Sequence, residues 1–178
     1  MNDELFDVCD ANDQVLHQAP RSVVHANRWL HRAVHVFVLN SSGQLLLQKR
    51  SATKDSDPLT YTSSASGHVD AGEDYDTAAL RELEEELGLA APLERLAKFP
   101  ASPETCYEHT VVYRTLTDAP PTFRREEIET GDYYSLPAIE AWLAARPAEF
   151  SQGFGTLFAW YRDNWADRPY TPTILSLP

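Results

Sequence analysis

The chain has 178 residues, 43% of them hydrophobic and 24% charged, so it can bury a sizeable core and is not globally disordered. Its net charge of -12 argues against a surface for nucleic acid or an anionic membrane, because such surfaces gather Lys and Arg. Cys9 and Cys106 do not form a disulfide or zinc pattern, and the N-terminus lacks a basic region followed by an apolar segment, so we expect one cytoplasmic domain over residues 1–178.

The first part of the chain predicts two hairpins and a loop. The N-terminal hairpin spans residues 5–18 around a polar turn. A β-branched and aromatic run at 33–40, followed after Ser-Ser-Gly by 44–49, is the clearest hairpin pattern in the chain. Polar residues 50–61 predict the loop that follows.

A helix is predicted between Asp74, which can act as its N-cap, and Gly88, which supplies a stop. Beyond it, strands are predicted at 93–99, 110–116 and 132–135, helices at 138–145 and 150–165, and an extended tail at about 168–178.

The predicted helix has an acidic edge beside an apolar stripe. At 100° per residue, Glu82, Glu85 and Glu86 fall within about 100° of one another. Like charges at this spacing repel, and the nearby cation in the helix, Arg81, points off the acidic edge. Carboxylate oxygens at this density suit Mg²⁺, whereas the alternative is an ordinary solvated helix face.

The wider spacing favours the metal site. Gly67 is followed after five residues by Glu73, and after seven more by Arg-Glu-Leu-Glu-Glu-Glu-Leu-Gly-Leu at 81–89. This pattern is a complete Nudix box over residues 67–89, and the chain resembles the Nudix family. The resemblance implies an α/β fold, specifically an α/β/α sandwich with a mixed sheet.

The resemblance also implies a site and a reaction. Glu82, Glu85 and Glu86 are expected to bind Mg²⁺ or Mn²⁺, together with the backbone carbonyl near Ser66 or Gly67. Arg81 is expected to orient a carboxylate, and Glu73 to support the loop and the helix. The reaction implied is metal-assisted hydrolysis of a diphosphate bond in a nucleoside diphosphate linked to another moiety, or in a related small metabolite.

Further roles are less specific. Glu85 and Glu108 are both candidates for the general base, and sequence does not choose between them. Lys49, Arg50 and Lys54 are candidates for contacting substrate phosphates, although ordinary surface charge is an equal alternative. Glutamates of the acidic run at 126–129 are candidates for another metal ligand, but the favoured interpretation is a solvated surface segment.

Residues outside the box make isomerase the main alternative. The segments 31–34, 45–50 and 53–55 resemble the Nudix branch related to isopentenyl-diphosphate isomerase. His31 and His68 match two histidines of the metal site in those isomerases, whereas His25 is one residue from its expected offset.

The acid and base of those isomerases are not matched. Ser66 stands where they have a cysteine before Gly-His, and Cys106 stands where they have the first Glu of a Glu-x-Glu pair, while Glu108 matches the second. Hydrolase is therefore favoured. A third alternative is a Nudix module that senses a nucleotide without cutting it, and a homodimer remains possible.

Overall fold

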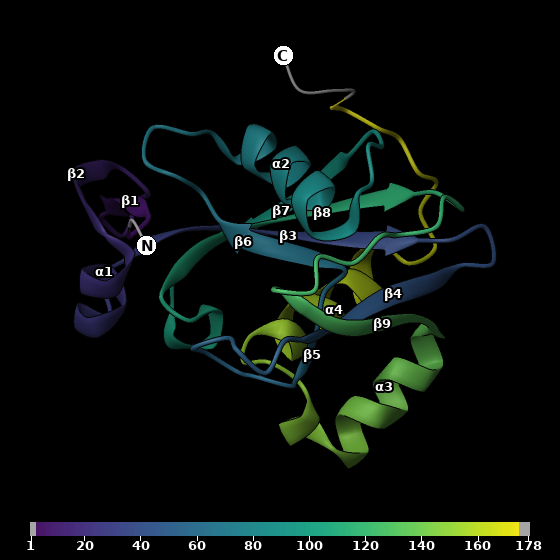
Figure 1. Cartoon of the computed structure of the whole chain (residues 1–178). Coiled ribbons are helices and arrows are strands. Elements are labelled where there is room, and N and C mark those ends of the chain that lie inside the picture. The colour runs from purple at the N-terminus through teal and green to yellow at the C-terminus, as the bar shows by residue number, and fades with distance from the viewer. Residues whose placement is uncertain (1–2, 175–178) are drawn as a thin grey trace.

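The structure is a computed structural model that describes residues 3–174 (Figure 1). Within these residues a mixed sheet of seven strands lies beside a separate two-stranded sheet. The seven strands are β3 (His31–Leu39), β4 (Gln44–Arg50), β5 (Tyr61–Thr62), β6 (Ala65–His68), β7 (Glu94–Phe99), β8 (Glu108–Leu116) and β9 (Ile128–Ser135). The two-stranded sheet contains β1 (Leu5–Cys9) and β2 (Val15–Pro20), and the helices are α1 (Arg21–Asn27), α2 (Tyr75–Leu87), α3 (Leu136–Ala145) and α4 (Phe154–Trp165).

The large sheet lies between helices, which confirms the predicted α/β/α arrangement (Figure 1). β3 pairs in parallel with β8 and antiparallel with β6, so the sheet is mixed. Successive side chains of β3 point to opposite faces. Val34 and Val36 pack in the same core cluster as Leu83 of α2, whereas Phe37 packs with Phe158 of α4 in a second cluster.

Helix α2 begins and ends where the sequence predicts. The Asp74 side chain accepts a hydrogen bond from Thr77 N at 2.9 Å, which satisfies a free donor of the first turn. Gly88 ends the helix in the left-handed conformation at φ 62°. The predicted helix at 150–165 is shorter than expected: Phe150 forms a bridge with Tyr61, Gly153 adopts φ 86°, and α4 begins only at Phe154.

The hairpin predicted at 33–49 is wrong for most of its length, because β3 and β4 pair only at Leu39 and Leu45. Beyond this point β6 takes the place beside β3, and β4 pairs with β5 and β9 instead. The buried Ser64 hydroxyl accepts a hydrogen bond from Val38 N (2.8 Å) and donates one to the carbonyl of Leu46 (2.6 Å). It thus replaces the ladder contacts that β3 and β4 would otherwise make.

We expect Ser64→Ala to destabilise the protein by about 3 kcal/mol, because a buried N–H and a buried carbonyl would each lose a partner. The free energy of unfolding in urea measures the effect. Ser42→Ala, at an exposed turn position, is the matched control and should change stability by less than about 0.5 kcal/mol. Equal stability of the two variants would contradict the bridging role of Ser64.

The N-terminal segment, residues 3–30, forms a small lobe beside the large sheet. The predicted hairpin is present, with Phe6 opposite Ala19, and α1, which the sequence analysis did not predict, follows it directly. Phe6 and Val24 share a small core of their own. The hairpin turn is fixed by Asp13, whose carboxylate accepts hydrogen bonds from Arg32 Nε (2.6 Å), Tyr75 OH (2.9 Å) and Lys98.

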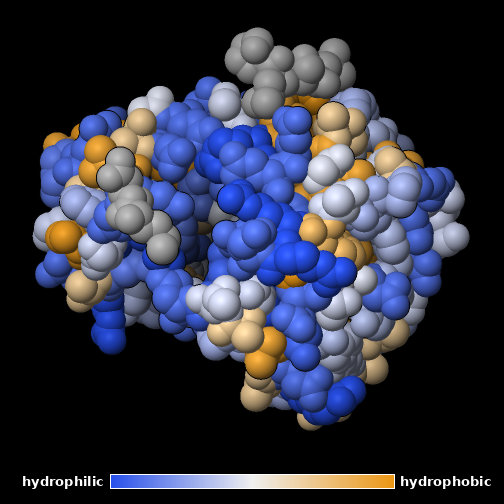
Figure 2. Space-filling view, in the orientation of Figure 1, coloured by the Kyte–Doolittle hydropathy of each residue, from blue (hydrophilic) through white to orange (hydrophobic). Residues whose placement is uncertain are grey.

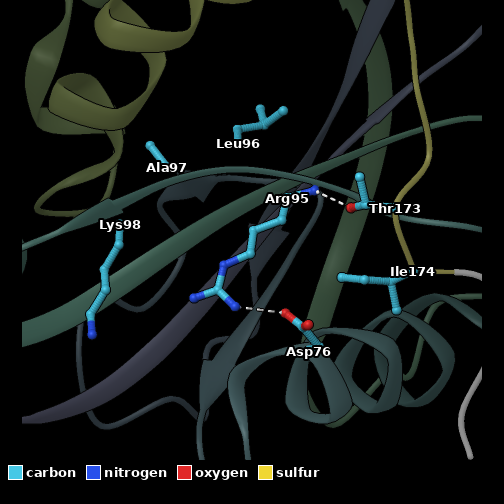
Figure 3. A pocket seen from close by; sticks show the side chains of 7 residues that line it. All are labelled: Asp76, Arg95, Leu96, Ala97, Lys98, Thr173 and Ile174. Carbon is cyan, nitrogen blue, oxygen red and sulfur yellow. Dashed lines mark hydrogen bonds and ion pairs between the residues drawn. The ribbon is translucent and has the colours of Figure 1, made fainter.

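The C-terminal segment runs along the sheet edge as far as residue 174, and the remaining part of the predicted tail, 175–178, lies outside the described residues. Ile174 and Leu93 exchange backbone hydrogen bonds of 2.7 and 2.9 Å. Arg95 N donates to Thr173 Oγ1 (3.3 Å), and the Arg95 guanidinium donates to Asp76 (3.0 Å; Figure 3). Within residues 3–174, no helix combines the length and the apolar character needed to cross a membrane.

Candidate active site

Two glutamates of α2 meet the backbone of β6. The Glu86 carboxylate, in a residue that is 5% exposed, accepts hydrogen bonds from Ser66 N (2.9 Å) and Gln48 Nε2 (2.8 Å). A methyl group on Gly67 would overlap the carboxylate of Glu82, so only glycine allows this close approach. The box thus places two carboxylates, one turn apart on the helix, against consecutive peptide groups of β6.

Burial raises the pKa of both glutamates, and their mutual repulsion raises that of Glu86 further, although the charge of Lys54 acts in the opposite direction on both. Arg81 lowers the pKa of Glu82, to which it donates a hydrogen bond of 2.6 Å. Among residues 3–174 no Lys, Arg or His forms an ion pair with Glu86. A buried carboxylate without a cationic partner is costly in a folded protein.

Arg81 connects the box loop to the helix. Its guanidinium donates to both carboxylate oxygens of Glu73 (3.0 and 2.8 Å), to Glu82, and to the carbonyl of His68 (3.0 Å). Glu73 in turn accepts a hydrogen bond from Asp70 N at 3.0 Å. This geometry is consistent with a supporting role for Glu73 and an orienting role for Arg81.

The third predicted metal ligand, Glu85, lies apart from the buried pair. Its side chain is 47% exposed and lies 3.7 Å from Arg81 and 3.8 Å from Arg124. The structure therefore brings Glu82 and Glu86 together and leaves Glu85 at the surface beside them.

The predicted phosphate-binding cations occupy different surroundings. Lys54 forms an ion pair with Glu127. It also lies close enough to Glu82 and Glu86 for its charge to lower their pKa, which burial raises. Lys49 instead lies over the Tyr61 ring, with Nζ 5.7 Å from its centroid, and Arg50 donates to the carbonyl of Ser56 at 2.9 Å. Of the acidic run at 126–129, Glu127 is the residue that reaches this region, through Lys54.

Three histidines form a second cluster next to the first. One ring nitrogen from each of His25, His31 and His68 lies within 4.8 Å of the others. His31 Nδ1 lies 2.9 Å from the carbonyl of Trp29, whereas its buried Nε2 has no hydrogen-bond partner in residues 3–174. Because a ring nitrogen bonded to a carbonyl carries the proton, the lone pair of His31 Nε2 points into the cluster, as it does in histidines that bind metals.

Glu108 faces the same cluster. One carboxylate oxygen lies 3.2 Å from His68 Nε2 and 3.7 Å from His31 Nε2. Burial alone would raise the pKa of Glu108, but the two neighbouring histidines hold it well below its ordinary value. Of the two candidates for the general base, Glu108 thus belongs to the histidine cluster and Glu85 to the rim of the carboxylate pair.

His25 reaches the cluster in spite of its offset because it lies on α1. That helix ends in a left-handed residue, Arg28, which turns the chain back toward β3. The sequence analysis named His25 but did not predict the helix that carries it, because this seven-residue helix follows a proline and has no polar side-chain cap. Phe6 of the hairpin packs against all three histidine rings, with centroid distances of 4.5 to 6.0 Å.

The histidine cluster lies where the N-terminal lobe meets the large sheet, and the carboxylate pair lies between α2 and β6. In Figure 2 a hollow separates this lobe, on the left, from the mainly hydrophilic surface over α2. A separate open pocket of about 470 Å³ lies between α2 and β7, and none of the predicted site residues lines it (Figure 3).

Comparison with known proteins gives consistent results. The sequence model of the NUDIX domain matches residues 29–154. A Nudix hydrolase of Deinococcus radiodurans is 34% identical over 152 residues, covering 83% of this chain and 88% of the relative. Isopentenyl-diphosphate Delta-isomerase 2 of Photorhabdus laumondii is 31% identical over 157 residues, covering 85% and 89%.

Solved structures agree with the sequence matches. A crystal structure of a Deinococcus radiodurans protein superposes with a TM-score of 0.76 at 29% identity, covering 91% of this chain and 99% of that one. The Nudix domain of a Shewanella oneidensis protein, crystallised with ADP-ribose, gives a TM-score of 0.61 at 14% identity over 82% and 98%, a likeness of fold alone. Together with the box and the sandwich that carries it, these matches identify the chain as a member of the Nudix family and as an enzyme of the Nudix hydrolase type.

Proposed function

We propose that the protein is a Mg²⁺-dependent hydrolase that cleaves the phosphoanhydride bond of a nucleoside diphosphate linked to another moiety, or of a related small metabolite. The observation that carries this proposal is the buried Glu86, which no cation within residues 3–174 neutralises and which lies beside Glu82. The isolated charge is costly in the protein alone, so the arrangement favours a bound cation.

The donor set fits Mg²⁺. The two carboxylates and the adjoining carbonyls of Ser66 and Gly67 are hard oxygen ligands, and the lack of a side chain at Gly67 keeps the approach open. Bound there, Mg²⁺ would neutralise phosphate charge and lower the pKa of a coordinated water. Mn²⁺ has the same ligand preference and is an acceptable substitute.

The surrounding residues supply the other functions. We assign proton removal from the attacking water to Glu85, because its carboxylate is exposed beside the buried pair, whereas Glu108 is a weak base held by two histidines. Arg81 holds Glu82 and the box loop in place. Lys54 can exchange Glu127 for a substrate phosphate, since both partners are anionic oxygens.

The test is a Mg²⁺-dependent screen of nucleoside diphosphates and triphosphates, dinucleotides, nucleotide sugars, ADP-ribose and coenzyme A, with products identified by mass. We expect a product formed by cleavage between two phosphates, and no turnover in excess chelator. Turnover that persists after the chelator removes all divalent metal would refute the mechanism. Binding without turnover would favour the sensor alternative.

The histidine cluster favours a second candidate, isopentenyl-diphosphate isomerase. His25, His31, His68 and Glu108 form a donor set of borderline nitrogen and carboxylate ligands, and the unpartnered His31 Nε2 fits a metal. The relatives named as isopentenyl-diphosphate isomerases also support this second candidate. Two residues argue against the isomerase. The Ser66 hydroxyl is a poor acid, and the Cys106 thiol donates a hydrogen bond to the carbonyl of Gln152, with Sγ 3.8 Å from the oxygen.

One assay separates the two candidates. Isopentenyl diphosphate is incubated with the protein and either Mg²⁺ or Mn²⁺, and dimethylallyl diphosphate and released phosphate are quantified. Because the acid and base are incomplete, we expect no isomerisation. Formation of dimethylallyl diphosphate at an enzymatic rate would replace the hydrolase proposal.

A further inference from the structure

His35 lies across the β3–β6 ladder from Ser66, near the histidine cluster. It lies on β3, four residues after His31, and alternation along the strand puts both side chains on the same face. In the ladder with β6, His35 is opposite Ser66, whose N–H holds Glu86, and Ala33 is opposite His68. The register thus places His35 beside the short strand β6, which contacts the carboxylate pair through Ser66 and carries His68 of the histidine cluster.

Ser63 fixes the His35 ring. His35 Nδ1 lies 2.7 Å from Ser63 Oγ, a buried hydroxyl that also lies 3.4 Å from the carbonyl of Ala65. The shorter contact is a strong hydrogen bond, whereas 3.4 Å is near the limit for an O–H donor. A hydroxyl has one hydrogen, so in the arrangement where Ser63 donates it across the shorter contact, Nδ1 is the acceptor and the hydrogen of the neutral imidazole is on Nε2.

The ring is neutral at physiological pH. Burial lowers the pKa of His35 to about 4, with Arg50 of β4 and His68 of β6 acting in the same direction and Glu108 of β8 in the opposite one. A neutral imidazole with a fixed tautomer is a directional donor that does not change charge as substrate arrives.

The donor has no partner inside the protein. Within residues 3–174, His35 Nε2 makes no hydrogen bond, and unlike Nε2 of His31 it is not sealed from solvent. An ordinary structural histidine in a sheet would satisfy both nitrogens or bury an apolar edge. In His35, Nδ1 is hydrogen-bonded to Ser63, whereas Nε2 has no partner within residues 3–174 and lies on the face of the sheet that carries Glu108 and His68.

We propose that His35 is a substrate-binding residue that donates a hydrogen bond from Nε2 to a phosphate oxygen of the bound diphosphate, with Ser63 as its positioning residue. This inference rests on the proposed diphosphate hydrolase function and extends it to residues outside the box. A hydrogen bond to a charged oxygen contributes a gain in affinity of about 10- to 100-fold.

The first experiment uses methylenediphosphonate, a non-hydrolysable analogue of pyrophosphate, with Mg²⁺ and the full-length protein. Long-range ¹H–¹⁵N spectra report the imidazole nitrogens, and the spectrum of His35→Gln assigns the His35 signals. We expect Nε2 of His35 to shift on addition of the analogue while Nδ1 keeps its unprotonated position. If backbone amides of Ser66 and Gly67 shift and His35 does not, this inference is overturned and the proposed function stands.

If no signal of the protein responds to Mg²⁺ and the analogue, the diphosphate site itself is absent and both proposals fall. The two failures are therefore distinguishable in a single titration.

The second experiment measures dissociation constants of the same analogue for variants. His35→Leu should weaken binding about 10- to 100-fold, and His35→Gln, whose amide can donate from a similar place, should recover most of the loss. Ser63→Ala should weaken binding about threefold to tenfold, because the tautomer is no longer fixed. His17→Leu on the hairpin, where the imidazole makes an edge-to-face contact with Trp29, is the control and should bind as wild type.

The double variant separates positioning from general structure. If Ser63 acts through His35, then His35→Leu combined with Ser63→Ala should bind no more weakly than His35→Leu alone. Additive losses would overturn the role of Ser63, and wild-type affinity in His35→Leu would overturn the role of His35. Thermal unfolding of each variant checks that affinity, and not folding, has changed.

Discussion

Replacing Glu86 with Gln should lower kcat about 10³-fold, or about 4 kcal/mol of transition-state stabilisation, while leaving the protein at least as stable as wild type. The carboxylate is buried and lacks a cationic partner, so a neutral amide removes a destabilising charge. The amide oxygen can still accept the hydrogen bond from Ser66 N. Activity and stability should therefore change in opposite directions, as they do where a site is built for a ligand and not for the fold.

The measurements are kcat at saturating Mg²⁺ on the substrate found by the screen, and thermal unfolding without metal. Glu84→Gln is the matched control, because Glu84 is an exposed glutamate of the same helix with the same charge. It should retain wild-type kcat. A Glu86→Gln protein with wild-type turnover, or one that loses activity only because it unfolds, would contradict the metal site.

Asp13→Asn should destabilise the protein by about 3 kcal/mol, because it leaves Arg32 and Lys98 without the buried charge that pairs them. Asn is the appropriate replacement, since it tolerates the left-handed backbone at φ 62°. Asp10→Asn, at the other end of the turn, is the control. Its side-chain oxygen can still accept from Asn12 N and Gln14 N, so stability should stay within about 0.5 kcal/mol of wild type.

Asp13 should also shape acid unfolding. Burial opposes its ionisation, but hydrogen bonds from Lys98, Arg32 and Tyr75 prevail and lower its pKa to about 2. The folded pKa lies below the unfolded value of about 3.9, so the stabilisation is complete above pH 4 and is lost as pH falls toward 2. Urea midpoints between pH 5 and 2 should fall more steeply for wild type than for Asp13→Asn. Parallel curves would show that Asp13 does not control this transition.

The parts of the site that one local segment encodes could be predicted from the sequence. The box fixes α2 through the Asp74 cap and the Gly88 stop, and it places Glu82 and Glu86 one turn apart. That Glu85 lies at the surface while its neighbour is buried could not be read from helical spacing. It depends on where β6 and β4 meet the helix, which Gln48 and Ser66 determine.

Other features depend on contacts between distant segments. The pattern at 33–49 correctly predicted two strands, but the prediction that they pair with each other was wrong. The Ser64 hydroxyl that bridges them is a single polar group, and it leaves no hydrophobic pattern in the sequence. The reach of His25 depends on a short helix that is stabilised by packing on Phe6 and not by its own sequence. Likewise, the partners of Asp13 come from three elements far along the chain.

The four residues of β6 have a consequence for ligand binding. Ser66 and Gly67 contact the glutamates of α2, and the next residue, His68, belongs to the histidine cluster. A displacement of this short segment by a ligand on one side is transmitted to the other within one peptide unit. Occupancy of the two centres should therefore be thermodynamically linked, with each ligand altering the affinity for the other by the same factor.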